Sequence, residues 1–185
     1  MLPARRYRWG CQPNATRKLR GSVAVPIQQG EDQWEAAAVP DVPERLLSTD
    51  LVDEIEFLAA RARSLGSAHA NAVLAPLDLK VRSYSVLAMA CSGTEPSQRE
   101  LADFLRLDPS QIVALVDALE QRGLVLRAAD SRDRRSKVIQ PTAAGRELYK
   151  RATASVRAAE NTSLAALDGP ERDQLRVLLR KIAFG

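Results

Sequence analysis

Residues 97–139 have the sequence SQRELADFLRLDPSQIVALVDALEQRGLVLRAADSRDRRSKVI, and this stretch decides the fold. It predicts two short helices followed at once by a basic hairpin. Ser97 begins the first helix with a capping box, in which the Ser97 hydroxyl accepts a backbone N–H and the Glu100 carboxylate reaches back to the Ser97 N–H. Apolar residues three and four positions apart then form a stripe that one helix face would bury. The stripe consists of Leu101, Phe104 and Leu105.

The second helix begins in a similar way. Asp108 is the expected N-cap, Pro109 follows at a position that needs no N–H, and Gln111 takes the third position of the helix. Gly123 fits a left-handed cap at the C-terminal end. Because only two or three residues separate the two helices, the pair has the spacing of a helix-turn-helix corner, although an ordinary helical hairpin would have it too. The expected buried stripe is Ile112, Leu115, Val116 and Leu119.

A basic hairpin follows the second helix, with two short strands expected at residues 124–127 and 136–140. Residues 123–137 include five basic and two acidic side chains, a net charge of +3. Residues 96–122 include three basic and five acidic side chains, a net charge of −2. Cations at a hairpin tip are attracted to phosphates or to a narrow minor groove. The segment therefore indicates nucleic-acid binding, with a plain solvated turn as the alternative.

Residues from about 45 to 182 resemble the MarR family of winged helix-turn-helix transcriptional regulators. The resemblance implies a mainly α fold with a small β-hairpin wing (α+β). It also implies a homodimer whose two recognition helices enter successive major grooves of a pseudo-palindromic operator. The matching segments are the helix at 97–105, Asp108-Pro109-Ser110, LEQRGLV at 119–125, Asp133-Arg134-Arg135, and TAAG at 142–145, which matches the family's Leu-Thr-x-x-Gly.

Caps and apolar spacing predict the remaining helices. One is expected at about 48–73, capped by a hydroxyl at position 48 or 49, and the next at about 78–91. Thr142 would cap a helix of roughly 25 residues, and Asp168 would begin the last helix with a capping box. Apolar stripes lie along the first and last of these helices, at Leu51, Ile55, Leu58, Ala62 and Leu65, and at Leu175, Leu178, Leu179 and Ile182. These stripes would pair with a second copy of the chain, or else pack within the monomer.

The expected domain organisation has two parts. A MarR-like domain spans 45–185, with the winged helix-turn-helix at about 76–141 and dimerisation helices at about 48–73 and 142–183. Residues 1–44 are expected to be a disordered extension, because six cations and no acid in 1–30 precede five acids in 31–44. The basic arm could add non-specific affinity for DNA. Equally, translation of the natural protein could begin near Val39–Leu46, which would remove the arm.

The exposed face of the recognition helix is expected to read bases. Many members of the family have Thr and Arg on this face, where this chain has Val113 and Ala114, with Ala118 one turn later. Such side chains touch a thymine methyl group but cannot form a bidentate hydrogen-bonded contact to a purine. Base reading would then fall to Ser110 and Gln111, helped by DNA shape.

The wing is expected to supply the remaining DNA contacts. Arg135 would insert into the minor groove, with Asp130 or Asp133 orienting its guanidinium through a charge-assisted hydrogen bond. Pro141 replaces the Leu of the family's motif, so the last wing strand should stop at Gln140. At the first helix of the pair, the first two residues either contact a phosphate or merely cap the helix. The expected backbone contacts come from Ser97, Gln98, Arg132, Arg134 and Lys137, and Arg127 is a further predicted DNA-binding residue.

The resemblance implies a sequence-specific, double-stranded DNA-binding regulator, a repressor that a small effector releases. The family's effectors, aromatic or anionic, commonly bind between the dimer helices and the DNA-binding lobe. By position the candidates are His69, Arg82 and Tyr84, although a lone histidine near a helix end is more typical of a surface or structural residue than of a ligand group, and Tyr84 is more typical of a core residue. Some relatives sense peroxide through a cysteine, which makes redox sensing through Cys91 an alternative. Cys91 lies in an apolar stretch, which favours an inert buried thiol.

Composition favours a cytoplasmic regulator. Apolar residues make up 45% of the chain, and no apolar run approaches the ~20 residues of a membrane span. Two cysteines give no disulfide framework, and the arginine-bearing N-terminus lacks the apolar stretch of a secretory signal. One histidine and two distant cysteines offer neither a metal set nor a Cys/His pair. We therefore expect no metal, no cofactor and no catalysis; a winged-helix module that binds another protein is the main alternative.

Overall fold

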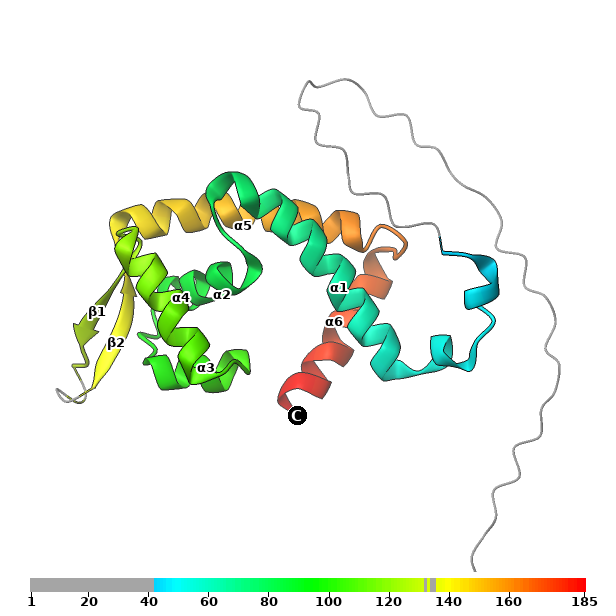
Figure 1. Cartoon of the computed structure of the whole chain (residues 1–185), viewed down its shortest axis with the longest axis horizontal. Helices are drawn as coiled ribbons and strands as arrows, with labels where there is room; N and C mark the ends of the chain where they lie inside the picture. Colours follow the sequence, from blue (N-terminus) through cyan, green and yellow to red (C-terminus); the bar gives the residue numbers. More distant parts are fainter. Residues whose placement is uncertain (1–41, 132, 134–135) are drawn as a thin grey trace, which may run out of the picture. The chain divides into compact units, whose positions relative to one another are not determined.

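The computed structural model describes residues 42–131, 133 and 136–185 (Figure 1). These residues are mostly helical, with one antiparallel hairpin, as the sequence predicted. The helices are α1 (Ile55–Leu74), α2 (Val81–Cys91), α3 (Gln98–Leu105), α4 (Pro109–Gln121), α5 (Ala143–Ser163) and α6 (Gly169–Phe184). The strands are β1 (Val125–Ala129) and β2 (Lys137–Pro141), and short 3-10 turns lie at Glu44–Leu46, Asp50–Asp53 and Ala75–Leu77. Most of the predicted extension at 1–44 lies outside the described residues.

The first long helix begins later than predicted, at Ile55 rather than at position 48 or 49. The Ser48 hydroxyl donates to the Arg45 carbonyl at 2.9 Å, and the Thr49 hydroxyl donates to the Leu46 carbonyl at 3.0 Å. Both hydroxyls therefore complete the preceding 3-10 turn and do not cap α1. Local sequence favours both uses of a Ser or Thr side chain, so the pattern alone could not decide between them.

The second helix also begins later than predicted, at Val81 rather than at Asp78. Asp78 has a φ of 50° and ends the 3-10 turn in the left-handed region, so it cannot begin an α-helix. Asn71 of α1 takes the place of a local cap, because its side-chain carbonyl accepts the Val81 N–H at 2.9 Å. This cap joins α1 to the start of α2.

The wing pairs β1 with β2 in a register that sets Val125 opposite Pro141. The prediction that the strand stops at Gln140 is therefore wrong. Thr142 N donates to the Leu124 carbonyl at 3.0 Å, which places Pro141 in the adjacent non-hydrogen-bonded pair, where no N–H is needed. The backbone nitrogens of Pro141 and Ile139 both face away from β1, and Ile139 N donates to the Pro96 carbonyl at 2.8 Å. The wing is thus attached to the loop before α3.

The hydrophobic core lies beneath the helix-turn-helix and the wing. It collects buried side chains from α2, α3, α4, both strands and α5, and Leu87, Ile112 and Ile139 are each fully buried. The N-terminus of α5 comes so close to β1 that a Cβ on Gly145 would lie 1.9 Å from the Leu124 carbonyl oxygen. This contact explains why glycine is needed three residues after the Thr142 cap, which accepts the Gly145 N–H at 3.0 Å.

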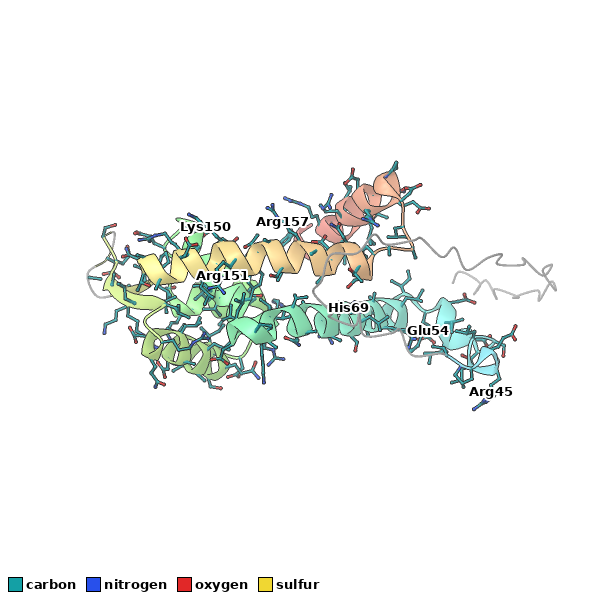
Figure 2. The ribbon with its side chains drawn as sticks, turned by 90° about the horizontal axis from the view of Figure 1, so that it is seen from above. Arg45, Glu54, His69, Lys150, Arg151 and Arg157 are labelled. Carbon is teal, nitrogen blue, oxygen red and sulfur yellow. The ribbon has the colours of Figure 1, made fainter. Side chains whose placement is uncertain are left out.

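The helices outside this core leave apolar surface exposed. Helix α1 packs along α5 (Figures 1 and 2). Near the N-terminus of α1, however, Ile55 is 76% exposed, and near the end of α6, Ile182 is 77% exposed. The predicted stripes on the first and last helices are therefore largely uncovered within one copy of the chain. No helix among the described residues is long and apolar enough to cross a membrane.

Candidate nucleic-acid interface

Helix α4 has one buried face and one exposed face. Ile112, Val116 and Leu119 are buried in the core. Four of the residues predicted to contact bases, Ser110, Gln111, Val113 and Ala114, are exposed. The structure therefore brings these four residues together on the accessible face of the helix that follows the tight turn after α3.

The N-terminus of α4 is capped as predicted, but without a reciprocal contact from Gln111. The Asp108 carboxylate accepts the Ser110 backbone N–H at 2.8 Å and the Ser110 hydroxyl at 2.5 Å. These hydrogen bonds lower the pKa of the Asp108 carboxyl below its usual value, and the bond from the Ser110 hydroxyl has the largest effect. The Gln111 side chain instead lies toward α2, where its amide oxygen accepts a hydrogen bond from Arg82 Nη1 at 3.3 Å.

The start of α3 forms the predicted capping box. Ser97 N donates to the Glu100 carboxylate at 2.7 Å, and Glu100 N donates to the Ser97 hydroxyl at 3.2 Å. The hydroxyl of Ser97 also donates to that carboxylate, at 2.7 Å. Gln98 follows at the first position of the helix and accepts a hydrogen bond from the base of the wing.

Arg127 of β1 makes that hydrogen bond, and its guanidinium contacts three side chains. Its Nε donates to the Gln98 amide oxygen at 2.8 Å, one Nη donates to Asp117 at 2.5 Å, and the other donates to Glu120. Partial burial on its own would lower the pKa of Arg127, but the hydrogen bonds to the two carboxylates raise it overall. The side chain is 19% exposed. Arg127, predicted to bind DNA, thus joins the wing to α3 and α4.

The sequence reasoning had not assigned a role to Asp117 or Glu120. Both lie on α4, one helical turn apart. Arg127, which they contact, follows Asp117 by ten positions and Glu120 by seven. The sequence does contain a signal for this role, because these two acids are the charged residues of an otherwise uncharged helix at 109–121. Acids that face DNA would repel it unless a cation neutralised them, so a basic partner could have been expected.

The wing tip is described only in part. Asp130 is buried, with 7% exposure, and its backbone N donates to the Ser136 carbonyl at 3.0 Å. The Asp133 carboxylate accepts the Ser136 hydroxyl at 3.1 Å, while Lys137 is exposed at the start of β2. The three arginines predicted at the tip, Arg132, Arg134 and Arg135, lie outside the described residues. The orientation of Arg135 by Asp130 or Asp133 stays a prediction.

A cavity of about 630 Å³ lies between α1, the start of α2 and the helix-turn-helix. Three cationic side chains, Arg63, Lys80 and Arg82, line it, and none of its described lining residues is acidic. Asn71, Leu105 and Leu115 contribute to its walls. Such a lining favours an anionic ligand, because a carboxylate or phosphate would form charge-assisted hydrogen bonds there.

The three predicted effector residues do not share this cavity. Arg82 lines it, whereas His69 and Tyr84 are not among its lining residues. His69 lies on α1 (Figure 2), and its Nδ1 is 2.7 Å from the Ser163 hydroxyl of α5. The Tyr84 hydroxyl is 3.3 Å from the Thr153 hydroxyl. Both residues therefore contact α5. Arg63 and Lys80 were not predicted from the sequence. Lys80 is a cation close to the predicted start of α2, whereas Arg63 belongs to α1 and reaches the cavity only because α1 packs against α2.

Cys91 has the environment of an unreactive thiol. Burial raises its pKa, and the nearby Arg146 offsets this increase only in part. A raised pKa keeps the thiol protonated at neutral pH, which disfavours reaction with an oxidant. Among the described residues, no cluster of three or more His, Cys, Asp or Glu side chains could hold a metal ion.

Comparison with known proteins identifies the arrangement. The MarR family model matches residues 79–137. The HTH-type transcriptional repressor Rv2887 of Mycobacterium tuberculosis is 32% identical over 126 residues, which cover 68% of this chain and 91% of the repressor. The crystal structure of CouR from Rhodococcus jostii RHA1 bound to p-coumaroyl-CoA is 45% identical, covers 74% of this chain and 96% of CouR, and superposes with a TM-score of 0.68. The complex of Rv2887 with DNA is 29% identical, covers 70% and 97% of the two chains, and has a TM-score of 0.60.

Proposed function

Because this chain belongs to the MarR family of transcriptional regulators, we propose that it is a cytoplasmic repressor that binds specific double-stranded DNA and is released by an anionic effector. We assign it no catalytic activity. The observation that carries the proposal is the accessible face of α4 beside a wing that Arg127 holds through Gln98, Asp117 and Glu120. A fixed wing beside an exposed helix allows one protein surface to contact a major groove and its flanking backbone together.

The proposed major-groove contacts follow from the exposed residues of α4. Gln111 carries the only amide among the four and is the side chain suited to a purine edge, while Val113 and Ala114 suit thymine methyl groups. The Ser110 hydroxyl already donates its one proton to Asp108, so in this arrangement it could only accept a hydrogen bond, for example from the exocyclic amine of a base. Sequence preference would therefore be concentrated near Gln111.

The wing contacts are proposed from sequence, with Arg135 in the minor groove and Arg132, Arg134 and Lys137 at phosphates. Replacing Arg135 with alanine should weaken operator binding by about 1–3 kcal/mol. Arg157→Ala is the matched control, because it removes one exposed cation from α5, further along the chain from the wing (Figure 2). The control should lose less than about 0.5 kcal/mol of operator-binding free energy. A loss this small for Arg135→Ala would exclude insertion of Arg135 in the minor groove.

We propose that two copies pair through the exposed apolar surface of α1 and α6. The surface includes Ile55, Leu58, Val177, Leu178 and Ile182, each between 48% and 77% exposed in one copy. Exposed apolar side chains on the first and last helices are stabilised by burial against a second copy, and two-fold pairing is the commonest solution. Light scattering at micromolar concentration should give twice the chain mass, and a monomer would contradict the pairing.

We propose that the effector binds in the cavity lined by Arg63, Lys80 and Arg82. Its cationic lining would attract a carboxylate or a phosphate-bearing thioester. The bound compounds of two relatives have this chemistry, since CouR was crystallised with p-coumaroyl-CoA and Rv2887 with salicylic acid. Titration of the protein with each compound, followed by calorimetry, would identify which of the two chemical classes it accepts.

Selection of duplexes from a random pool tests the proposed function. The expected product is a pseudo-palindrome whose half-sites lie about one helical turn, 10–10.5 base pairs, apart. Recovery of no enriched sequence, together with no retention of any duplex, would contradict DNA binding. That outcome would favour the alternative of a winged-helix module that binds a protein.

A further inference from the structure

Arg82 contacts both of the surfaces that the proposed function employs. It lines the cationic cavity, and its Nη1 donates to the Gln111 amide oxygen on α4 at 3.3 Å. The two residues are 29 positions apart in sequence, one in the first turn of α2 and the other in the first turn of α4. One guanidinium therefore lies between the proposed effector and the side chain best suited to read a base.

The contact fixes the direction of the Gln111 amide. A glutamine at the third position of a helix commonly turns back to the N–H of the capping residue, but here the amide oxygen accepts from Arg82. Arginine has donors only, so it selects the oxygen of the amide and turns the NH₂ group away. The NH₂ group is then presented to acceptors such as purine N7.

We propose that Arg82 positions Gln111 for base reading and leaves it when an anion occupies the cavity; the inference rests on the proposed function. An anion between Arg63, Lys80 and Arg82 offers a charged acceptor, which attracts the guanidinium by direct ion pairing and can accept two parallel hydrogen bonds from it, whereas the Gln111 amide is neutral. Arg82 then turns to the anion. Gln111 loses its fixed orientation and can turn back toward Asp108, so the affinity for the operator falls.

A double-mutant cycle tests the positioning role without an effector. Operator affinity is measured by anisotropy for wild type, Arg82→Gln, Gln111→Ala and the double variant. Arg82→Gln should weaken binding about 3- to 10-fold, the scale of one ordinary hydrogen bond. In the Gln111→Ala background the same change should cost less than about 2-fold. Equal losses in both backgrounds would overturn the proposal, since Arg82 would then act only through its charge.

Two further readouts separate positioning from charge. Arg157→Gln removes one exposed cation from α5 and should leave affinity within about 2-fold of wild type, as distant surface changes usually do. Selection with Arg82→Gln should relax base preference at the same operator position as Gln111→Ala. Retained preference at that position would overturn the positioning role.

The effector arm uses p-coumaroyl-CoA and salicylate as probes, with probe binding measured separately by calorimetry. A probe that binds should lower the operator affinity of wild type about 10-fold or more. In Gln111→Ala the probe should bind as before but lower operator affinity less than about 3-fold. If the variant binds the probe and loses the operator as wild type does, this inference fails and the proposed function stands. If wild type binds neither probe nor any duplex, both fail.

Discussion

Replacing Gly145 with alanine should loosen the junction between the wing and α5. The added Cβ would lie 1.9 Å from the Leu124 carbonyl oxygen and 2.9 Å from its carbonyl carbon. Both are backbone atoms, so no flexible side chain can move aside. That oxygen also accepts the Thr142 N–H at 3.0 Å, which closes the last pair of the wing. The helix must therefore shift away from the strand, and this hydrogen bond and the Thr142 cap shift with it.

The expected cost can be assembled from these contacts. Overpacking typically costs about 1–3 kcal/mol, and weakening one backbone hydrogen bond adds about 1 kcal/mol. We therefore expect Gly145→Ala to lower the free energy of unfolding by about 2–4 kcal/mol. Gly66→Ala is the matched control, because a Cβ at that position of α1 would meet no atom within 4 Å. An alanine inside a helix should raise stability there by about 0.5–1 kcal/mol.

Urea unfolding followed by circular dichroism would measure both variants. Protein concentration must be equal throughout, since the stability of a dimer depends on it. Duplex affinity, measured in the same samples, should fall for Gly145→Ala and be unchanged for Gly66→Ala. The reasoning would be refuted if Gly145→Ala unfolded within about 0.5 kcal/mol of wild type, the range of neutral surface changes.

Three further predictions concern single groups. Arg127→Met should cost about 1–3 kcal/mol of stability. It should also weaken duplex binding, because Asp117 and Glu120 then face DNA without their cation. Urea unfolding measures the stability and anisotropy the duplex affinity, and an unchanged affinity would contradict the prediction. The pKa of Asp108 is lowered in the folded state, so its carboxylate stabilises the fold above the unfolded value of about 3.9 and this contribution is lost as pH falls through the lower folded pKa. Wild type should therefore lose more stability on acidification than Asp108→Asn, and parallel acid transitions would refute the assignment. The raised pKa of Cys91 predicts that this thiol is alkylated slowly at pH 7 and faster at alkaline pH. The measurement uses Cys11→Ser protein, in which Cys91 is the remaining cysteine. Rapid alkylation at pH 7, or loss of DNA affinity after treatment with an oxidant, would restore the redox alternative.

Local chemistry predicted much of the fold. The N-caps at Ser97, Asp108, Thr142 and Asp168 are all present, because a capping side chain acts within three residues of its own position. The left-handed cap at Gly123, with a φ of 66°, depends on equally short-range sterics. The predicted helix starts at 48 and 78 were wrong for two reasons. Ser48 and Thr49 complete a 3-10 turn and cap no helix, and α2 is capped by Asn71 from the preceding helix rather than by a neighbouring residue.

The candidate site depended on contacts that the sequence does not reveal. Charge counting located the basic wing, but the partners of Arg127 lie on helices α3 and α4. In the same way, Arg82 and Gln111 were singled out separately, and their contact depends on how α2 packs against α4. Spacing along the chain predicts which side chains share a helix face, whereas contacts between helices require the packed fold.

The salt dependence of duplex affinity tests DNA binding by α4 and the wing most directly. The purified full chain would be titrated against a selected duplex by anisotropy at several salt concentrations from about 50 to 300 mM. A dimer that neutralises about six phosphates should lose affinity steeply, with log Kd rising against log salt with a slope of about 5. Absence of binding at the lowest salt concentration, or an affinity that does not change with salt, would contradict a DNA-binding role.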